Sequence, residues 1–192
     1  MLFICLGDSI TYGYPYGPAF SWVSLSQDSV NVELVNKGHN GDTIGDMLAR
    51  FQRDVLALKP TDVLVLGGTN DAWNRIPLKS VREQLASMLH LANTHNIRFH
   101  LGLPIPINIH SLDDPFLDQA IETAPYLESY RNWMRQYAAQ NKFDLIDFYT
   151  PMLSSDGTGN PDYYVDSGHP NHKGYQIMAT TMIGYLQNAN LA

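Results

Sequence analysis

Four residues of this chain are of the types that carry out acyl transfer. Ser9 ends an apolar run near the start of the chain, and Asn70 follows a second apolar run. Asp166 and His169 are three residues apart near the other end. A serine hydroxyl is a weak nucleophile until a neighbouring base takes its proton, and imidazole suits that role because it titrates near neutral pH. A carboxylate one turn away from the imidazole can fix its tautomer, so the residues fit a serine, histidine and aspartate triad.

Acyl transfer also needs hydrogen-bond donors for the negative charge that develops on the carbonyl oxygen. The backbone N–H groups of Ser9 and Gly41 and the side-chain amide of Asn70 are three candidates. Glycine at position 41 lets the backbone approach a substrate without a Cβ in the way. One donor of this kind changes the rate by about 10²–10³-fold.

The elements that must position these groups follow from the hydrophobic pattern. Apolar runs alternate five times along the chain with amphipathic stretches of helical spacing. This alternation predicts one α/β domain over residues 1–192, with a parallel five-stranded sheet of flavodoxin-like order 2-1-3-4-5 and helices on both faces. The predicted strands are 2–6, 30–35, 62–66, 97–103 and 143–147, and the predicted helices are 19–27, 44–58, 81–92, 126–139 and 175–186.

The predicted topology brings the candidate groups together. Parallel strands have their carboxyl ends at the same edge of a sheet, and ligands bind there. Ser9, Gly41 and Asn70 follow the first three predicted strands, and the segment that holds Asp166 and His169 follows the fifth. We therefore expect one crevice that contains the nucleophile, the base and the donors.

The composition limits the classes of partner. The 192 residues carry a net charge of -7 without any run of Lys or Arg, which argues against a nucleic-acid surface. The single cysteine, Cys5, excludes a disulfide within the chain. No apolar run reaches the roughly 18 residues that cross a bilayer, and the first residues do not resemble a signal peptide. We expect a cytoplasmic protein with a small-molecule substrate, although a longer precursor could be secreted.

Four short blocks of the sequence resemble those of the SGNH-hydrolase superfamily, also called the GDSL family of esterases and lipases. They occur in the family's order and cover nearly the whole chain, and the first has Ile10 where many members have leucine. The blocks are residues 7–10, 36–43, 67–71 and 166–171.

The resemblance implies roles for the residues in these blocks. Ser9 would be the nucleophile, and His169 and Asp166 would complete the triad. Gly41 and Asn70 would join the Ser9 N–H as oxyanion donors. The family further implies a three-layer α/β/α fold and hydrolysis of esters, thioesters or acetylated sugars without a metal or another cofactor. His172 lies three residues after His169, but no further His or Cys cluster supports a metal site.

Several apolar and aromatic residues are candidates for the walls of the substrate pocket. Tyr12 and Tyr14 lie close to the nucleophile in the sequence and could form an aromatic lip, or could simply pack within their loop. Trp73 and Ile105 could line the pocket or belong to the core. The segment 104–125, which is rich in proline, is either a lid or wall of the site or an irregular surface excursion.

The leading hypothesis from the sequence is a serine esterase for small or short-chain acyl esters. The enzymatic alternatives are a carbohydrate O-deacetylase and a lysophospholipase or thioesterase. A flavodoxin-like binding module is the alternative outside enzymes, because a fold does not determine a function. The sequence contains neither of the glycine-rich phosphate-binding motifs, GxxxxGK[ST] and GxGxxG, which disfavours nucleotide binding.

Overall fold

The fold is a five-stranded parallel sheet covered by helices on both faces. The computed structural model describes residues 1–189 and 191. The strand order is β2-β1-β3-β4-β5, which confirms the predicted flavodoxin-like order. The strands are β1 (Leu2–Gly7), β2 (Glu33–Gly38), β3 (Asp62–Leu66), β4 (Arg98–Leu103) and β5 (Asp144–Asp147).

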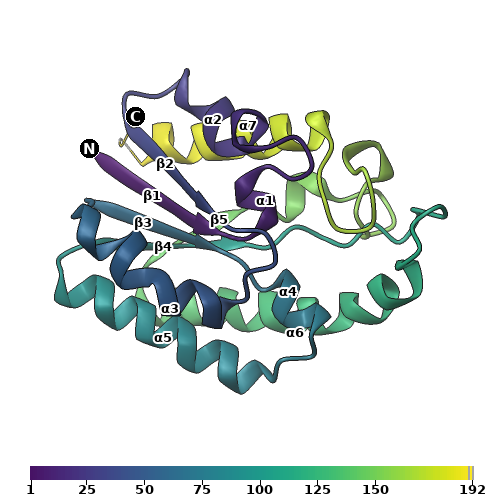
Figure 1. The fold of residues 1–192 in the computed structure, drawn as a ribbon, viewed down its shortest axis with the longest axis horizontal. Helices are drawn as coiled ribbons and strands as arrows, with labels where there is room; N and C mark the ends of the chain where they lie inside the picture. The colour runs from purple at the N-terminus through teal and green to yellow at the C-terminus, as the bar shows by residue number, and fades with distance from the viewer. Residues whose placement is uncertain (190, 192) are drawn as a thin grey trace.

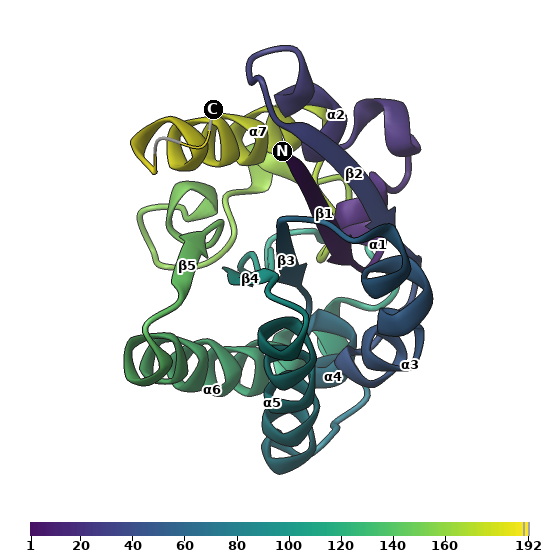
Figure 2. The ribbon, with the colours of Figure 1, turned by 90° about the vertical axis from the view of Figure 1, so that its left-hand side faces the viewer.

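The helices form the two outer layers of the α/β/α sandwich. Helices α3, α5 and α6 cover one face of the sheet, and α2 and α7 cover the other (Figures 1 and 2). The two shortest helices, α1 and α4, directly follow β1 and β3. The helices are α1 (Ser9–Tyr12), α2 (Trp22–Gln27), α3 (Ile44–Asp54), α4 (Thr69–Trp73), α5 (Leu78–Thr94), α6 (Leu117–Asn141) and α7 (His172–Asn188).

Each face of the sheet has its own hydrophobic core. Along β1, Ile4 points into the core under α3, α5 and α6, and its neighbour Phe3 points into the core under α2 and α7. Both side chains are fully buried. Burial of a large apolar side chain contributes about 1.5–3 kcal/mol. Strands buried on both faces have continuous apolar sequences, and this pattern made β1 and β3 recognisable in the sequence.

The structure corrects the limits of several predicted elements. The helix predicted over 44–58 ends at Asp54 and is followed by a 3₁₀ turn over Leu56–Leu58, and the helices predicted over 81–92 and 175–186 are Leu78–Thr94 and His172–Asn188. The second strand is Glu33–Gly38 rather than 30–35. The first long helix is shorter than predicted: Ser21 caps it by accepting a hydrogen bond from the Ser24 N–H, so the helix begins at Trp22.

Helix α6 begins nine residues earlier than predicted, at Leu117 rather than 126, and contains Pro125. A proline in a helix interior costs about 3 kcal/mol. Buried residues on both sides of the proline, Ala120 and Leu127, pack into the core at helical spacing and offset this cost. The irregular segment is therefore 104–116 rather than 104–125.

The lengths and composition of the helices also bear on whether any could span a membrane. Within residues 1–189 and 191, no helix is both long enough and apolar enough to cross a bilayer.

Candidate active site

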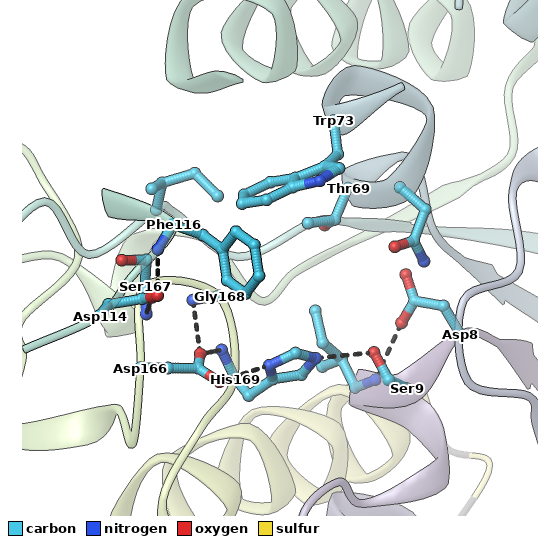
Figure 3. Close-up of a pocket in the computed structure, with 13 residues that line it drawn as sticks. Asp8, Ser9, Thr69, Trp73, Asp114, Phe116, Asp166, Ser167, Gly168 and His169 are labelled. Carbon is cyan, nitrogen blue, oxygen red and sulfur yellow. Dashed lines mark hydrogen bonds and ion pairs between the residues drawn. The ribbon is translucent and has the colours of Figure 1, made fainter. Parts of the chain in front are cut away.

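Ser9, His169 and Asp166 lie in hydrogen-bonding contact at the carboxyl edge of the sheet. The Ser9 Oγ is 3.0 Å from Nε2 of His169, and Nδ1 of His169 is 2.8 Å from Oδ2 of Asp166. The three side chains form a row, with the imidazole in the middle (Figure 3). If the Nδ1 proton is held by the carboxylate, Nε2 is free to accept the proton of the serine hydroxyl.

Ser9 is presented by the junction between β1 and α1. Strand β1 ends at Gly7, and Asp8 caps α1 by accepting a hydrogen bond from the Ile10 N–H at 2.9 Å. Ser9 is therefore the first residue of a helix, where the backbone N–H has no partner within the helix. The chain is tight at this point, because a Cβ on Gly7 would clash with the side chain of Thr11.

A tight turn orients the catalytic carboxylate candidate. The Oδ1 of Asp166 accepts hydrogen bonds from the N–H groups of Gly168 at 2.8 Å and His169 at 2.7 Å. Burial by itself would raise the pKa of Asp166. The hydrogen bond and charge of His169 and the two N–H donors outweigh burial and lower the pKa. The carboxylate is thus stabilised in the ionised form that a triad needs.

Residues of the segment 104–116 form hydrogen bonds with the turn that contains Asp166 and His169. The Asn108 N–H donates to the carbonyl of Ser167 at 2.9 Å, and Oδ2 of Asp114 accepts from the Ser167 N–H at 2.8 Å. The other oxygen of Asp114 accepts from the Phe116 N–H at 2.8 Å. The Asp114 carboxylate therefore connects the turn of Asp166 and His169 to the backbone of Phe116.

The candidate oxyanion donors come from the three segments that follow β1, β2 and β3. Asn70 lies in α4, and its Nδ2 donates to the carbonyl of Asp42 at 2.9 Å, which ties it to the loop that contains Gly41. Gly41 has a φ of +84°, a region that favours glycine. Within the described part of the chain, the N–H groups of Ser9 and Gly41 donate to no other acceptor. Ser9 and Asn70 line the cavity described next, whereas Gly41 is not among its lining residues.

A cavity of about 190 Å³ opens above the triad. The rings of Trp73 and Phe116 form its far wall, with centroids 6.3 Å apart and nearly perpendicular planes (Figure 3). The cavity is lined by Asp8, Ser9, Ile10, Thr69, Asn70, Trp73, Ile107, Asp114, Phe116, Asp166, Ser167, Gly168 and His169.

Two buried carboxyl groups beside the site have raised pKa values. Burial raises the pKa of Asp8 to about 7, against the opposing hydrogen bond from Ile10. Burial also raises the pKa of Asp71 to about 6. The carboxylate of Asp71 accepts from the Ile44 N–H at 3.0 Å, which fixes the start of α3 against α4. Perturbed carboxyl groups of this kind cluster at functional sites.

The predicted pocket residues fall into two groups. Trp73 lines the cavity, and the ring of Tyr14 lies against the ring of His169 with centroids 4.6 Å apart. Ile105 is buried in the core under α2 and α7 and does not reach the cavity, whereas Ile107 lines it. Tyr12 faces a different hollow, beside β2.

Two residues of the site were missed in the sequence. Asp114 and Phe116 line the cavity, and both come from the segment that could be a wall of the site. Their position in that long proline-rich segment was the only signal. His172, three residues after His169, stacks on Tyr16 with ring centroids 3.8 Å apart.

Comparisons with known proteins identify the family of this chain. The model of the GDSL-like lipase/acylhydrolase family matches residues 5–177. An acetylxylan esterase of Geobacillus stearothermophilus is 38% identical over 158 residues, which cover 80% of this chain and 72% of that protein. The uncharacterized lipoprotein YqeF of Bacillus subtilis (strain 168) is 28% identical over 177 residues, which cover 80% of this chain and 73% of that protein.

A solved structure shows the same fold. A member of the lipolytic protein G-D-S-L family from Veillonella parvula superposes with a TM-score of 0.81 at 26% identity, over 97% of this chain and 98% of that one. The family match extends over most of the chain and includes all the residues that line the cavity. The chain therefore belongs to the GDSL-like lipase/acylhydrolase family of ester hydrolases.

Proposed function

We propose that this protein is a serine esterase that hydrolyses small or short-chain acyl esters through an acyl-enzyme on Ser9. The observation that carries the proposal is the 3.0 Å contact between Ser9 Oγ and His169 Nε2, on the floor of a small cavity. A nucleophile within hydrogen-bond reach of a base that is itself oriented by a carboxylate is the arrangement that covalent acyl transfer requires.

In the first half-reaction, Ser9 Oγ attacks the acyl carbonyl as His169 takes the hydroxyl proton. The carbonyl oxygen becomes an oxyanion, which the N–H groups of Ser9 and Gly41 and the amide of Asn70 stabilise. His169 then gives its proton to the departing alkoxide. The carbon–oxygen bond to the alcohol breaks, and an ester on Ser9 remains.

In the second half-reaction, a water molecule takes the place of the alcohol. Its proton goes to His169, its oxygen attacks the acyl carbon, and the same donors stabilise the second oxyanion. Return of the proton to Ser9 Oγ releases the carboxylic acid. Asp166 stays ionised throughout and stabilises the imidazolium, in keeping with its lowered pKa.

The dimensions of the cavity support the preference for short acyl groups. Its volume is about 190 Å³, and Trp73 and Phe116 close its far side. Pockets for drug-sized ligands are typically about 300–1,000 Å³. An acetyl to butyryl group fits this space better than a fatty acyl chain.

A carbohydrate O-deacetylase is the second candidate. The aromatic wall adjoins the Asp114 carboxylate, and an apolar ring face beside a hydrogen-bond acceptor suits a sugar. The relative from Geobacillus stearothermophilus, at 38% identity, is named an acetylxylan esterase.

The test is a panel of p-nitrophenyl esters from two to eight acyl carbons, an acetyl thioester and acetylated xylo-oligosaccharides, assayed with the wild type and Ser9→Ala. We expect Ser9→Ala to lower kcat by about 10⁴–10⁶-fold. The wild-type rate should drop sharply beyond about four acyl carbons, in line with the cavity volume. Equal rates in the two proteins contradict the assignment of Ser9. Acetate release that is faster from the oligosaccharides than from the aryl acetate favours the deacetylase.

A further inference from the structure

The Arg50 side chain is buried behind the catalytic edge, where it contacts neither the cavity nor the triad. It lies on α3 with 8% of its surface exposed. A buried guanidinium is costly unless its N–H groups are taken up by good acceptors. The partners of Arg50 therefore indicate what holds it in this position.

One nitrogen of the guanidinium holds two neighbouring strands together. The Nη2 of Arg50 donates to the carbonyl of Gly7 at 2.9 Å and to the carbonyl of Lys37 at 2.9 Å. Gly7 is the last residue of β1, two residues before the nucleophile, and Lys37 is near the end of β2. The contacts thus lie at the carboxyl ends of β1 and β2, next to the segments that contain Ser9 and Gly41.

A second nitrogen holds the candidate oxyanion loop. The Nε of Arg50 donates to Oδ2 of Asp42 at 2.6 Å. Asp42 directly follows Gly41, and its carbonyl accepts from Nδ2 of Asn70 at 2.9 Å. A single residue, Asp42, therefore links the guanidinium to the candidate donors Gly41 and Asn70.

The third side of the guanidinium is oriented by its own helix. The Nη1 donates to Oδ2 of Asp54, one turn further along α3, at 3.1 Å. All three nitrogens are thus occupied by acceptors in fixed directions. A lysine would keep the charge, but a single ammonium lacks the planar fork that reaches all these acceptors together.

From these contacts we propose that Arg50 is a positioning residue that sets the geometry of the oxyanion hole without contacting the cavity itself. It fixes the Gly41–Asp42 loop and Asn70 at a set distance from the strand end that presents Ser9. This inference rests on the proposed function, because it assumes that these groups are the donors of an acyl-transfer site.

The position of Arg50 predicts a distinct kinetic effect. Loss of the guanidinium frees the loop, so the donors no longer meet the oxyanion at the right distance. Oxyanion stabilisation acts in the transition state and not in the bound substrate, so kcat should fall while KM stays nearly constant. A residue that shapes the pocket would change KM instead.

The experiment compares Arg50→Ala and Arg50→Lys with Arg53→Ala as the matched control. Arg53 lies one turn away on α3 and has a side chain that is 68% exposed, and among the residues that the structure describes it donates only to Asp54. Rates are divided by the number of sites that a fluorophosphonate titrates, so that unfolded protein does not count. We expect kcat on p-nitrophenyl acetate to fall about 10–100-fold in Arg50→Ala, with KM within about threefold, and to change less than about threefold in Arg53→Ala.

A double-mutant cycle with Asn70→Ala separates positioning from a general loss of stability. If Arg50 acts through the donors, the combined loss of kcat should be clearly smaller than the product of the two single losses, because both changes then disturb the same oxyanion site. Independent, multiplicative losses would overturn the proposal. If Arg50→Ala does not fold, Arg50→Lys carries the same cycle with a smaller expected loss.

Two other outcomes also overturn the proposal: a kcat in Arg50→Ala equal to that of Arg53→Ala, and a loss that appears only in KM. Neither outcome touches the proposed function, which is tested by Ser9→Ala and by labelling of the wild type at Ser9. Failure of that function would instead leave the wild type unlabelled by the fluorophosphonate.

Discussion

Two histidine–aspartate pairs, each with a hydroxyl partner, lie at opposite ends of the same sheet. At the carboxyl edge, His169 contacts Ser9 at 3.0 Å and Asp166 at 2.8 Å. At the amino edge, Nε2 of His100 contacts Asp62 at 2.8 Å, and Nδ1 contacts the hydroxyl of Tyr185 at 2.8 Å. Helix α7 connects the two ends, since it begins just after His169 and carries Tyr185 in its last turn.

The two pairs differ in what surrounds them. The His169 side chain is 30% exposed and faces a cavity with hydrogen-bond donors, whereas the His100 side chain is 2% exposed and stacks on Phe3. Asp62 is fully buried and also pairs with Arg98 at 2.8 Å. The hydroxyl partner differs as well, because burial and the neighbouring Asp144 carboxylate raise the pKa of Tyr185.

This contrast shows that hydroxyl, imidazole and carboxylate in line do not by themselves make an active site. At the carboxyl edge, the same three groups adjoin a cavity and donors for a developing charge. At the amino edge, the three groups connect β3, which holds Asp62, with β4, which holds His100, and with α7, which holds Tyr185. Tyr185 also donates to Asp144 at 2.8 Å, which adds β5 to the cluster. We infer that the first set serves catalysis and the second set serves stability.

The strongest test of this contrast exchanges the two carboxylates for amides, in Asp166→Asn and Asp62→Asn. Asp166→Asn should lower kcat by about 10⁴-fold, because the imidazole loses the group that fixes its tautomer, with little change in unfolding free energy. Asp62→Asn should lower the free energy of unfolding by about 1–3 kcal/mol, because the fully buried Asp62 carboxylate loses its hydrogen bonds with His100 and Arg98. Its kcat per titrated site should stay within about threefold of the wild type.

Urea unfolding and p-nitrophenyl acetate hydrolysis, measured on both variants, give the four numbers that the comparison needs. Comparable losses of kcat in both variants would show that the His100 cluster takes part in catalysis. A large loss of stability in Asp166→Asn would show that the catalytic pair is also structural.

The carboxyl groups of the two regions should also respond to pH with opposite signs. Hydrogen bonds from His100 and Arg98 outweigh burial and lower the pKa of Asp62, so its ionisation adds stability that is lost in acid. Burial raises the pKa of Asp8 to about 7, so the folded state holds this proton more tightly than the unfolded state does. The contribution of Asp8 is therefore fully present below about pH 4 and is lost as the pH rises to about 7.

Asp8→Asn should remove this loss while it keeps the helix cap, because asparagine caps as well as aspartate. Relative to the wild type, the variant should gain about 2–4 kcal/mol of unfolding free energy between pH 4.5 and pH 8, on the order of 1.4 kcal/mol per pKa unit. Urea unfolding at the two pH values measures the gain. The exposed Asp28, changed to asparagine, is the control and should show no such gain. If the difference in unfolding free energy between Asp8→Asn and the wild type were the same at both pH values, Asp8 would be ionised without cost in the folded state.

The same contrast explains which features the sequence could predict. The strand order followed from continuous apolar runs, and the triad candidates followed from polar residues at the ends of those runs. Both signals are local in the sequence. The pairing of His100 with Asp62 and Tyr185 joins residues 38 and 85 positions apart, and neither residue type nor spacing marks them in the sequence.

The pocket walls were harder to predict, because side-chain direction decides them. Ile105 and Ile107 come from the same irregular segment and have the same chemistry, yet one enters the core and the other lines the cavity. Arg50 was also out of reach, since its role depends on carbonyl groups from two strands that lie together only in the folded sheet.

The mildest test removes one hydroxyl from the stabilising cluster, in Tyr185→Phe, as the counterpart of Ser9→Ala. Without the phenol oxygen, the remaining polar partner of His100 Nδ1 within residues 1–189 and 191 is the Asp144 carboxylate at 3.6 Å. The variant should lose about 1 kcal/mol of unfolding free energy, the net worth of a typical hydrogen bond, and its kcat should stay within about twofold of the wild type. Each of the two substitutions deletes a single oxygen beside a histidine, so only the surroundings can account for a large difference in kcat. A drop of tenfold or more in Tyr185→Phe, with stability unchanged, would mean that α7 transmits the state of the amino edge to the triad.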